Sequence, residues 1–175
     1  MPKHFVAHGT PTGGLNCASV PGGERELRNL YAYPFAKVIQ NDDPVSIMGC
    51  YSAYDGIPVA HSAHFMTDLL RGELGFKGFV YSDWGSVDRL KSFHFAAETS
   101  EEAARKALIA GIDMDVYDWA YQTLEDQVNK GILDEAYVDR ACRRVLAAKF
   151  RLGVFDDPYG DPDKVDKVVR SKAHV

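Results

Sequence analysis

Asp83 and Trp84 are the neighbouring residues in this sequence best suited to chemistry. Asp83 follows the apolar run 78–82, and Trp84 comes directly after it. A carboxylate at the end of a strand can act as a nucleophile or a general base, and an indole offers a flat apolar face on which a sugar ring can stack. The alternative is a helix-capping Asp beside a core Trp, because Asp is common where strands pass into loops.

Other polar side chains follow the remaining apolar runs. Lys3 and His4 offer hydrogen-bond donors that could hold hydroxyl groups or keep a nearby carboxylate ionised, and Tyr51 follows a second run. Asp113 and Asp115 lie within a later one. A surface Lys and a buried His with satisfied hydrogen bonds are the structural alternative for the first pair.

Two pairs of histidines have spacings that could bind a metal on a helix, His4 with His8 and His61 with His64. Neither pair lies in a convincing helical pattern and no third ligand is evident, so metal binding is the weakest functional hypothesis. The sequence also has no GxxxxGK phosphate loop, no GxGxxG motif after a strand and no GxSxG nucleophile elbow. The carboxylate of Asp83 therefore remains the leading catalytic candidate.

These candidates need a scaffold that brings strand ends together. Short apolar runs predict strands at 3–7, 45–50, 78–82 and 111–116. Amphipathic stretches predict helices at 24–40, 65–74, 99–110, 119–130 and 134–152. The alternation predicts an α/β fold, specifically a partial (β/α)8 TIM-type barrel of about four βα units followed by C-terminal helices. A half barrel leaves open sheet edges, through which self-association is expected.

The composition is that of a globular chain. The 175 residues are 46% hydrophobic and carry a formal net charge of -5. This mild acidic balance predicts neither a nucleic-acid partner nor an anionic membrane partner. No apolar run reaches the roughly 18 residues of a membrane-spanning helix, and the N-terminus lacks the basic-then-apolar pattern of a secretory signal. Cysteines at 17, 50 and 142 are too scattered for a disulfide framework.

Several sequence blocks occur in a characteristic order along nearly the whole chain. They are Lys3-His4-Phe5 with Glu24-Arg25-Glu26-Leu27, Met48-Gly49-Cys50-Tyr51 with Asp55-Gly56-Ile57-Pro58, 67–78 with Ser82-Asp83-Trp84-Gly85, 111–115, and 149–155. Together they resemble the blocks of glycoside hydrolase family 3, the β-glucosidase and β-xylosidase family. The third resembles the nucleophile signature of that family. The length, order and spacing of the blocks argue against a chance match.

The resemblance implies a role for each matching position. Asp83 matches the catalytic nucleophile, Trp84 the aromatic residue beside the sugar site, and Tyr51 a tyrosine near the nucleophile. Lys3 and His4 match the pair that binds sugar hydroxyls. Family members are retaining hydrolases of terminal β-linked sugars, with glucose the expected sugar here. The implied partner is therefore a β-linked oligosaccharide or glycoside, and the chemistry needs no metal or organic cofactor.

The chain also departs from the family pattern. Residues 1–157 resemble the C-terminal half of the catalytic barrel, without the earlier strands that supply an Asp and an Arg to the sugar. Residues 158–175 resemble a linker towards an absent α/β sandwich domain that carries the acid/base Glu. We therefore expect a fragment of a retaining β-glycosidase that is inactive or weakly active alone. The alternative is a non-catalytic carbohydrate-binding or interaction module.

Overall fold

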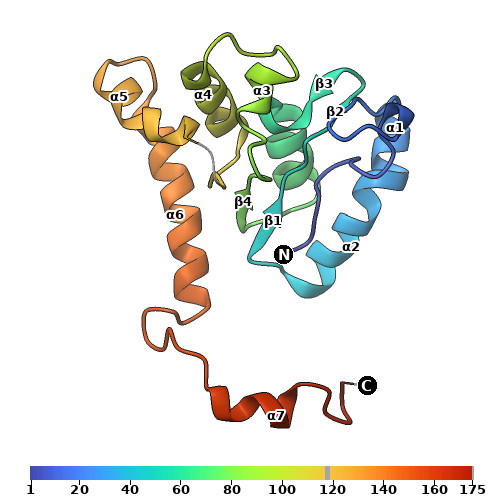
Figure 1. Cartoon of the computed structure of the whole chain (residues 1–175), viewed down its shortest axis with the longest axis vertical. Helices are drawn as coiled ribbons and strands as arrows, with labels where there is room; N and C mark the ends of the chain where they lie inside the picture. The colour runs from blue at the N-terminus through green and yellow to red at the C-terminus, as the bar shows by residue number, and fades with distance from the viewer. Residues whose placement is uncertain (117–118, 175) are drawn as a thin grey trace.

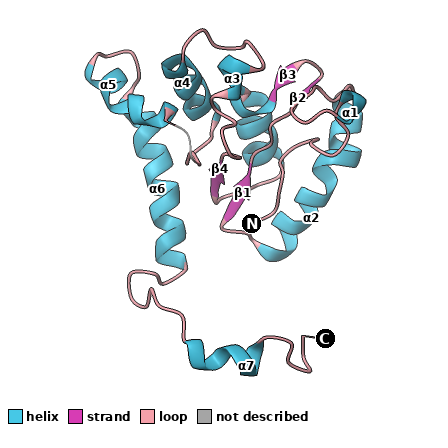
Figure 2. Ribbon diagram, viewed as in Figure 1, coloured by secondary structure: helices cyan, strands magenta, loops and turns pink. Residues whose placement is uncertain are grey.

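Four parallel segments form the centre of the molecule. The computed structural model describes residues 1–116 and 119–174. Strand β1 (Ser46–Met48) pairs in parallel with β4 (Phe79–Tyr81), and both lie at the centre of the body (Figures 1 and 2). Single parallel bridges join Phe5 to Gly49 and Tyr81 to Met114. The segments are therefore ordered as in the chain, and the predicted α/β class is confirmed.

All four predicted strands are shorter than expected, and two of them are reduced to single bridges. The runs 3–7 and 111–116 each meet the sheet through one bridge instead of forming a full strand. At the first run, Ala7 adopts a positive φ of 63°, so the chain turns out of the extended conformation immediately after its bridge. A short antiparallel hairpin of β2 (Ala53–Tyr54) and β3 (Ile57–Pro58) follows β1.

The helices surround this centre. In chain order they are η1 (Thr12–Gly14), α1 (Glu24–Glu26), η2 (Leu27–Ala32), α2 (Tyr33–Asp42), η3 (Val59–His61), η4 (His64–Glu73), α3 (Arg89–Ser92), α4 (Ser100–Ala110), η5 (Ala120–Thr123), α5 (Leu124–Asn129), α6 (Glu135–Arg151), η6 (Pro162–Lys164) and α7 (Val165–Val168). Of these, η2 and η4 have the wider π-helical turn, and η1, η3, η5 and η6 are single 3₁₀ turns.

Local sequence signals set several of the helix ends. The Thr99 hydroxyl accepts a hydrogen bond from the Glu102 amide at 3.1 Å and caps α4, and the Asp134 carboxylate caps α6. Pro34 lies in the first turn of α2, directly after the π-helical segment η2. Proline cannot donate its backbone hydrogen bond, and at this point the hydrogen-bond pattern changes from π to α within a stretch that is helical from 24 to 42, so the predicted helix 24–40 is present.

Each parallel segment contributes a fully buried apolar side chain to one core. These residues are Phe5, Ile47, Val80 and Ile112, each with 0% of its surface exposed. They share a single cluster with the buried residues of η4 and α4. Burial of apolar surface between sheet and helices therefore fixes the direction of the strands, and with it the edge at which their carboxyl ends meet.

Asp113 has a structural role instead of pointing into a site. Its side chain is fully buried, and its carboxylate accepts hydrogen bonds from Arg71 at 2.7 Å, from Arg144 at 2.8 Å and from the Val80 amide at 2.8 Å. Burial lowers the pKa of Arg71 to about 10, although the Asp113 carboxylate opposes that shift. Asp113 thus connects β4 to η4 and α6. Because both of its carboxylate oxygens are engaged in these contacts, it is not a catalytic candidate.

Replacing this buried carboxylate is expected to destabilise the chain strongly. In Asp113→Asn two partly buried guanidinium groups lose the counter-charge of a fully buried carboxylate, and breaking a buried pair costs about 3–5 kcal/mol. Urea unfolding followed by circular dichroism measures the loss. The matched control is Asp139→Asn, because Asp139 pairs with Arg143 on the exposed face of α6 and its loss should change the unfolding midpoint far less. Equal midpoints for the two variants would contradict this role for Asp113.

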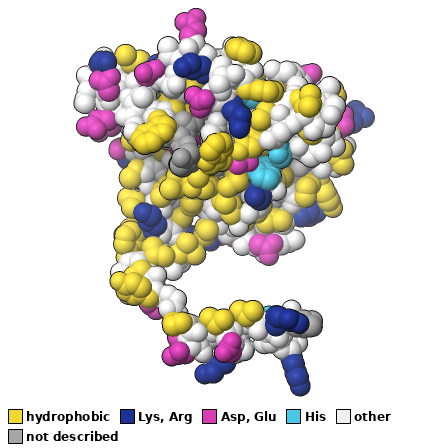
Figure 3. Space-filling view, viewed as in Figure 1, with side chains coloured by type: hydrophobic (Ala, Val, Ile, Leu, Met, Phe, Trp, Pro, Cys, Tyr) yellow, Lys and Arg dark blue, Asp and Glu magenta, His cyan; other side chains and the backbone are white. Residues whose placement is uncertain are grey.

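The second half of α6 and the segments after it are largely exposed. Of the apolar stripe predicted on this helix, Ala141 is buried, but Cys142 and Leu146 are exposed, and Phe150 beyond them is 69% exposed. Figure 3 shows apolar side chains along this helix, and α7 lies beyond its end (Figure 1). The expected linker 158–175 contains the short helical turns η6 and α7. Within the described ranges, no helix is both long and apolar enough to cross a membrane.

Candidate active site

Three polar side chains meet where neighbouring parallel segments end. His4 belongs to the first segment, whose Phe5 amide donates to the Met48 carbonyl of β1 at 2.8 Å. Tyr51 follows β1, and Asp83 follows β4. The register of β1 and β4 brings these ends to one edge of the sheet. His4 and Asp83, which are 79 positions apart in the chain, therefore come within contact distance.

A buried serine fixes the loop that carries Asp83. The hydroxyl of Ser82 donates to Asp115 Oδ1 at 2.8 Å and accepts the Val116 amide at 2.8 Å. The Ser82 amide also donates to the Met114 carbonyl. Asp115 is therefore engaged in holding the loop after β4. Asp83 directly follows Ser82, whose side chain and backbone hydrogen bonds hold the start of the loop.

The Asp83 carboxylate has two hydrogen-bond donors. Its Oδ2 is 3.3 Å from Nε2 of His4, and its Oδ1 accepts the Trp84 amide at 2.7 Å. The Asp83 side chain is 14% exposed and that of His4 is 25% exposed, so both remain accessible from solvent. Burial lowers the pKa of His4, opposed by the Asp83 carboxylate and assisted by the nearby positive charges of His8 and Lys3. A neutral His4 that donates from Nε2 would leave the negative charge on Asp83.

Tyr51 supports the backbone beside the carboxylate. Its hydroxyl donates to the Trp84 carbonyl at 2.7 Å, and the guanidinium carbon of Arg89 lies 4.8 Å from the centre of its ring. Nε2 of His94 is 2.7 Å from the Tyr51 carbonyl oxygen. Burial, together with the negative charge of Asp83, raises the pKa of Tyr51. The phenol therefore stays protonated and serves as a hydrogen-bond donor.

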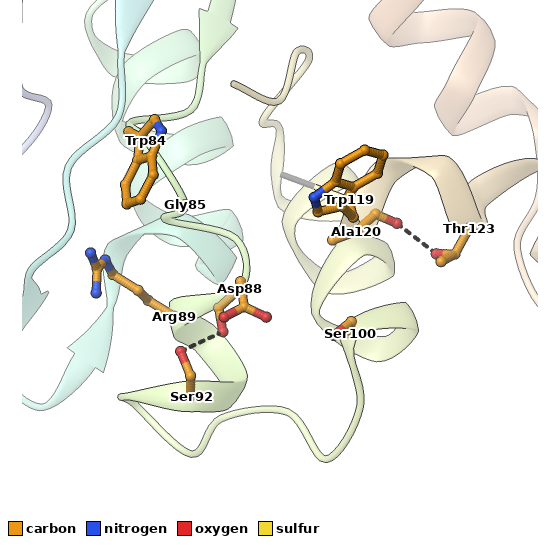
Figure 4. A pocket seen from close by; sticks show the side chains of 9 residues that line it. All are labelled: Trp84, Gly85, Asp88, Arg89, Ser92, Ser100, Trp119, Ala120 and Thr123. Carbon is orange, nitrogen blue, oxygen red and sulfur yellow. Dashed lines mark hydrogen bonds between the residues drawn. The ribbon is translucent and has the colours of Figure 1, made fainter. Parts of the chain in front are cut away.

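Trp84 forms one wall of an open hollow of about 490 Å³. Trp84 and Trp119 lie on opposite sides of this hollow, with Asp88 between them (Figure 4). The two indoles are 54% and 74% exposed. Ser100 and Thr123 also contribute to the lining. Exposed indoles facing a hollow offer apolar surfaces for a ligand ring.

Sequence reasoning missed Trp119 and Arg89 as neighbours of the candidate site. Trp119 was placed only at the start of a predicted helix, which begins instead with η5 and continues as α5. An exposed Trp immediately before a helix was the available signal. Arg89 lies in α3, which the sequence pattern did not predict, and its contact with Tyr51 joins residues that are distant in sequence.

Lys3 is placed differently from His4. It is exposed and lines a second hollow of about 380 Å³ together with His4, His8 and Tyr31. The structure thus brings His4, Tyr51, Asp83 and Trp84 together, whereas Lys3 lines the second hollow.

The metal-binding hypothesis has little support in the described part of the chain. Nε2 of His64 is 3.0 Å from Glu24, which itself pairs with Arg28, and no group of three or more His, Cys, Asp or Glu side chains among the described residues could hold an ion. His61 is partly buried and lies apart from that pair, near His94 and Lys106.

Two partly buried histidines, His61 and His94, are expected to make stability depend on pH. Burial lowers the pKa of both His61 and His94 from the ordinary value of 6.5. Below that pH the unfolded chain takes up protons that the folded chain resists, so the free energy of unfolding should fall as the pH falls. Urea unfolding across this range checks the expectation.

The matched variants separate these histidines from other titrating groups. The double variant His61→Gln with His94→Gln should lose much of the decline below pH 6.5, whereas His64→Gln, at the surface, should retain it. An unchanged slope in the double variant would show that other groups, His4 and the carboxylates among them, cause the decline.

Comparison with known proteins decides the family. The profile of the glycosyl hydrolase family 3 N-terminal domain matches residues 1–148. The chain belongs to this family. A β-xylosidase from Formosa agariphila is 37% identical over 172 residues, covering 94% of this chain and 23% of that protein. A lysosomal β-glucosidase from Dictyostelium discoideum is 35% identical over 164 residues, covering 92% and 20%.

Solved structures of family 3 enzymes have the same fold. A β-glucosidase from Erythrobacter marinus superposes with a TM-score of 0.92 at 38% identity over 98% of this chain. The β-glucosidase from Listeria innocua in complex with glucose gives a TM-score of 0.90 at 32% identity over 98% of this chain. These matches cover 23% and 24% of the longer chains, so the present chain spans about a quarter of the length of its relatives.

Proposed function

We propose that this chain carries the nucleophile half of a retaining β-glycosidase active site, within the C-terminal half of a (β/α)8 barrel. The observation that best supports this proposal is the position of the Asp83 carboxylate. It lies between the His4 ring and the Trp84 amide, at the edge of the sheet where the parallel segments end. A partly exposed carboxylate with fixed donors suits nucleophilic attack. Membership of glycosyl hydrolase family 3 supports the same reaction class.

In the proposed reaction Asp83 attacks the anomeric carbon of a terminal β-linked sugar. A carbon–oxygen ester bond forms to the carboxylate, and the bond from the anomeric carbon to the leaving oxygen breaks. That oxygen takes a proton from a general acid, and water later hydrolyses the ester to release the sugar. His4 and Lys3 are proposed to bind sugar hydroxyls, with Trp84 packing against the ring.

The acid in this reaction is proposed to come from outside the chain. Glu24 and Glu73 both pair with Arg28, and Glu102 pairs with Lys106. Among the described residues that line the hollow beside Trp84 there is no glutamate. Relatives named β-glucosidase and β-xylosidase make glucose and xylose the proposed sugars. The substrate is thus a β-linked oligosaccharide or glycoside.

Covalent trapping tests this proposal. A fluorinated glycosyl fluoride forms a long-lived ester with a retaining nucleophile, and its fluoride leaves without general acid help. Peptide mass spectrometry after incubation should find the added sugar on the peptide that contains Asp83. Sugar binding without any covalent label would instead support the alternative, a non-catalytic carbohydrate-binding module.

A further inference from the structure

His8 lies between two of the residues that flank Asp83. Its ring centre is 4.9 Å from that of His4, with the planes inclined at 59°, and 5.9 Å from that of Tyr51. Nδ1 of His8 is 3.2 Å from the hydroxyl oxygen of Ser52, whose surface is fully buried. The imidazole of His8 is therefore held on three sides by side chains of the first parallel segment and of the loop after β1.

We propose that His8 is a positioning residue, whose anchored ring keeps Nε2 of His4 turned towards Asp83. The proposal rests on the proposed roles of Asp83 and His4. The His4 side chain has two rotatable bonds, and rotation about the second exchanges the positions of its ring atoms. A packed neighbour removes that freedom before substrate arrives, so the hydrogen bond to Asp83 need not be ordered during the reaction.

The charges around His4 favour the same arrangement. The groups that act on it are Asp83 across the 3.3 Å contact, His8 beside its ring and Lys3 preceding it in the chain. A positive charge on His8 or Lys3 opposes a second positive charge on His4. A neutral ring facing a carboxylate must carry its proton on Nε2 to donate, so fixing the ring also selects one tautomer.

Nuclear magnetic resonance of the chain with ¹⁵N-labelled histidine tests the proposal directly. Long-range proton–nitrogen correlations report which ring nitrogen carries the proton, and His4→Gln assigns the signals of His4. In the unmodified chain, neutral His4 should carry its proton on Nε2. In His8→Ala it should show both tautomers and titrate closer to 6.5, because the packing ring and its charge are removed.

Matched variants separate ring packing from other effects. His8→Phe keeps an aromatic ring beside His4 and should preserve the Nε2 tautomer, whereas His64→Gln, beyond this group, should leave His4 unchanged. The same tautomer and titration for His4 in His8→Ala as in the unmodified chain would overturn the proposal. If His8→Ala does not fold, Ser52→Ala replaces it, and an unchanged His4 spectrum there has the same consequence.

The spectra are recorded without sugar, so they are independent of turnover. Failure of covalent labelling at Asp83 would overturn the proposed function while leaving the arrangement of His8 and His4 intact. Covalent labelling of Asp83, together with a His4 tautomer that does not change in His8→Ala, would support the proposed function and overturn the positioning role of His8.

Discussion

Asp83→Asn is expected to abolish covalent labelling by the fluorinated glycosyl fluoride. The amide is nearly isosteric with the carboxylate but has no negative charge with which to attack the anomeric carbon. In a full-length family 3 enzyme that contains this segment, removal of a covalent nucleophile should reduce turnover by several orders of magnitude. Labelled peptide yield and the rate with an activated aryl β-glucoside measure the two effects.

The fold should survive this substitution. The Trp84 amide donates to Oδ1 and His4 faces Oδ2, so the single asparagine oxygen can keep the Trp84 hydrogen bond while its amide nitrogen faces His4, whose neutral ring can accept in its other tautomer. The matched control is Asp68→Asn, an exposed carboxylate on η4, which should label as the unmodified chain does. Retained labelling or near-normal turnover in Asp83→Asn would remove Asp83 from the nucleophile role.

The isolated chain is expected to hydrolyse unactivated glycosides at close to background rates. Retaining hydrolysis needs two carboxyl groups about 5 Å apart, one to attack and one to protonate the leaving oxygen. General acid assistance contributes about a hundredfold to ten-thousandfold in rate. The proposed lack of that acid in this chain should penalise cellobiose far more than an activated aryl glycoside, whose leaving group needs little protonation. The ratio of the two rates, compared with that of a full-length family 3 enzyme, is the informative measurement.

The same chain is expected to self-associate. Leu146, Phe150 and Phe155 are exposed along and after α6, and the first segment meets the sheet through a single bridge at Phe5. Exposed apolar surface and open sheet edges favour association. Sedimentation velocity across a concentration series should show a rising mass. A monodisperse, cooperatively unfolding monomer that cleaves cellobiose at ordinary enzyme rates would contradict both expectations.

Local patterns in the sequence were sufficient for much of the framework. The strand that precedes Asp83, the Thr99 cap of α4 and the Asp134 cap of α6 depend on residues a few positions apart, and the structure contains all three. The family was also identifiable from sequence blocks, and the profile match over residues 1–148 confirms it. The position of Asp83 at a strand end follows from the same local signals.

Tertiary structure alone decided which polar residues face the site. Asp113 looked like a strand-end candidate, yet Arg71 and Arg144 converge on it from other elements and turn it into a buried ion-pair centre. The contact of His8 with His4 and Tyr51 also joins separate segments.

The surfaces that pack against each element explain the remaining differences between predicted and observed burial. The apolar face of α6 has the spacing of a buried stripe, but Cys142 and Leu146 are exposed in this chain. Periodicity records which face of a helix is apolar, whereas burial depends on what packs against it. The sequence by itself therefore determined most of the longer helices, the two central strands, the family and the nucleophile candidate. The geometry around Asp83 required the folded chain, because hydrogen bonds and ring contacts between distant segments set it.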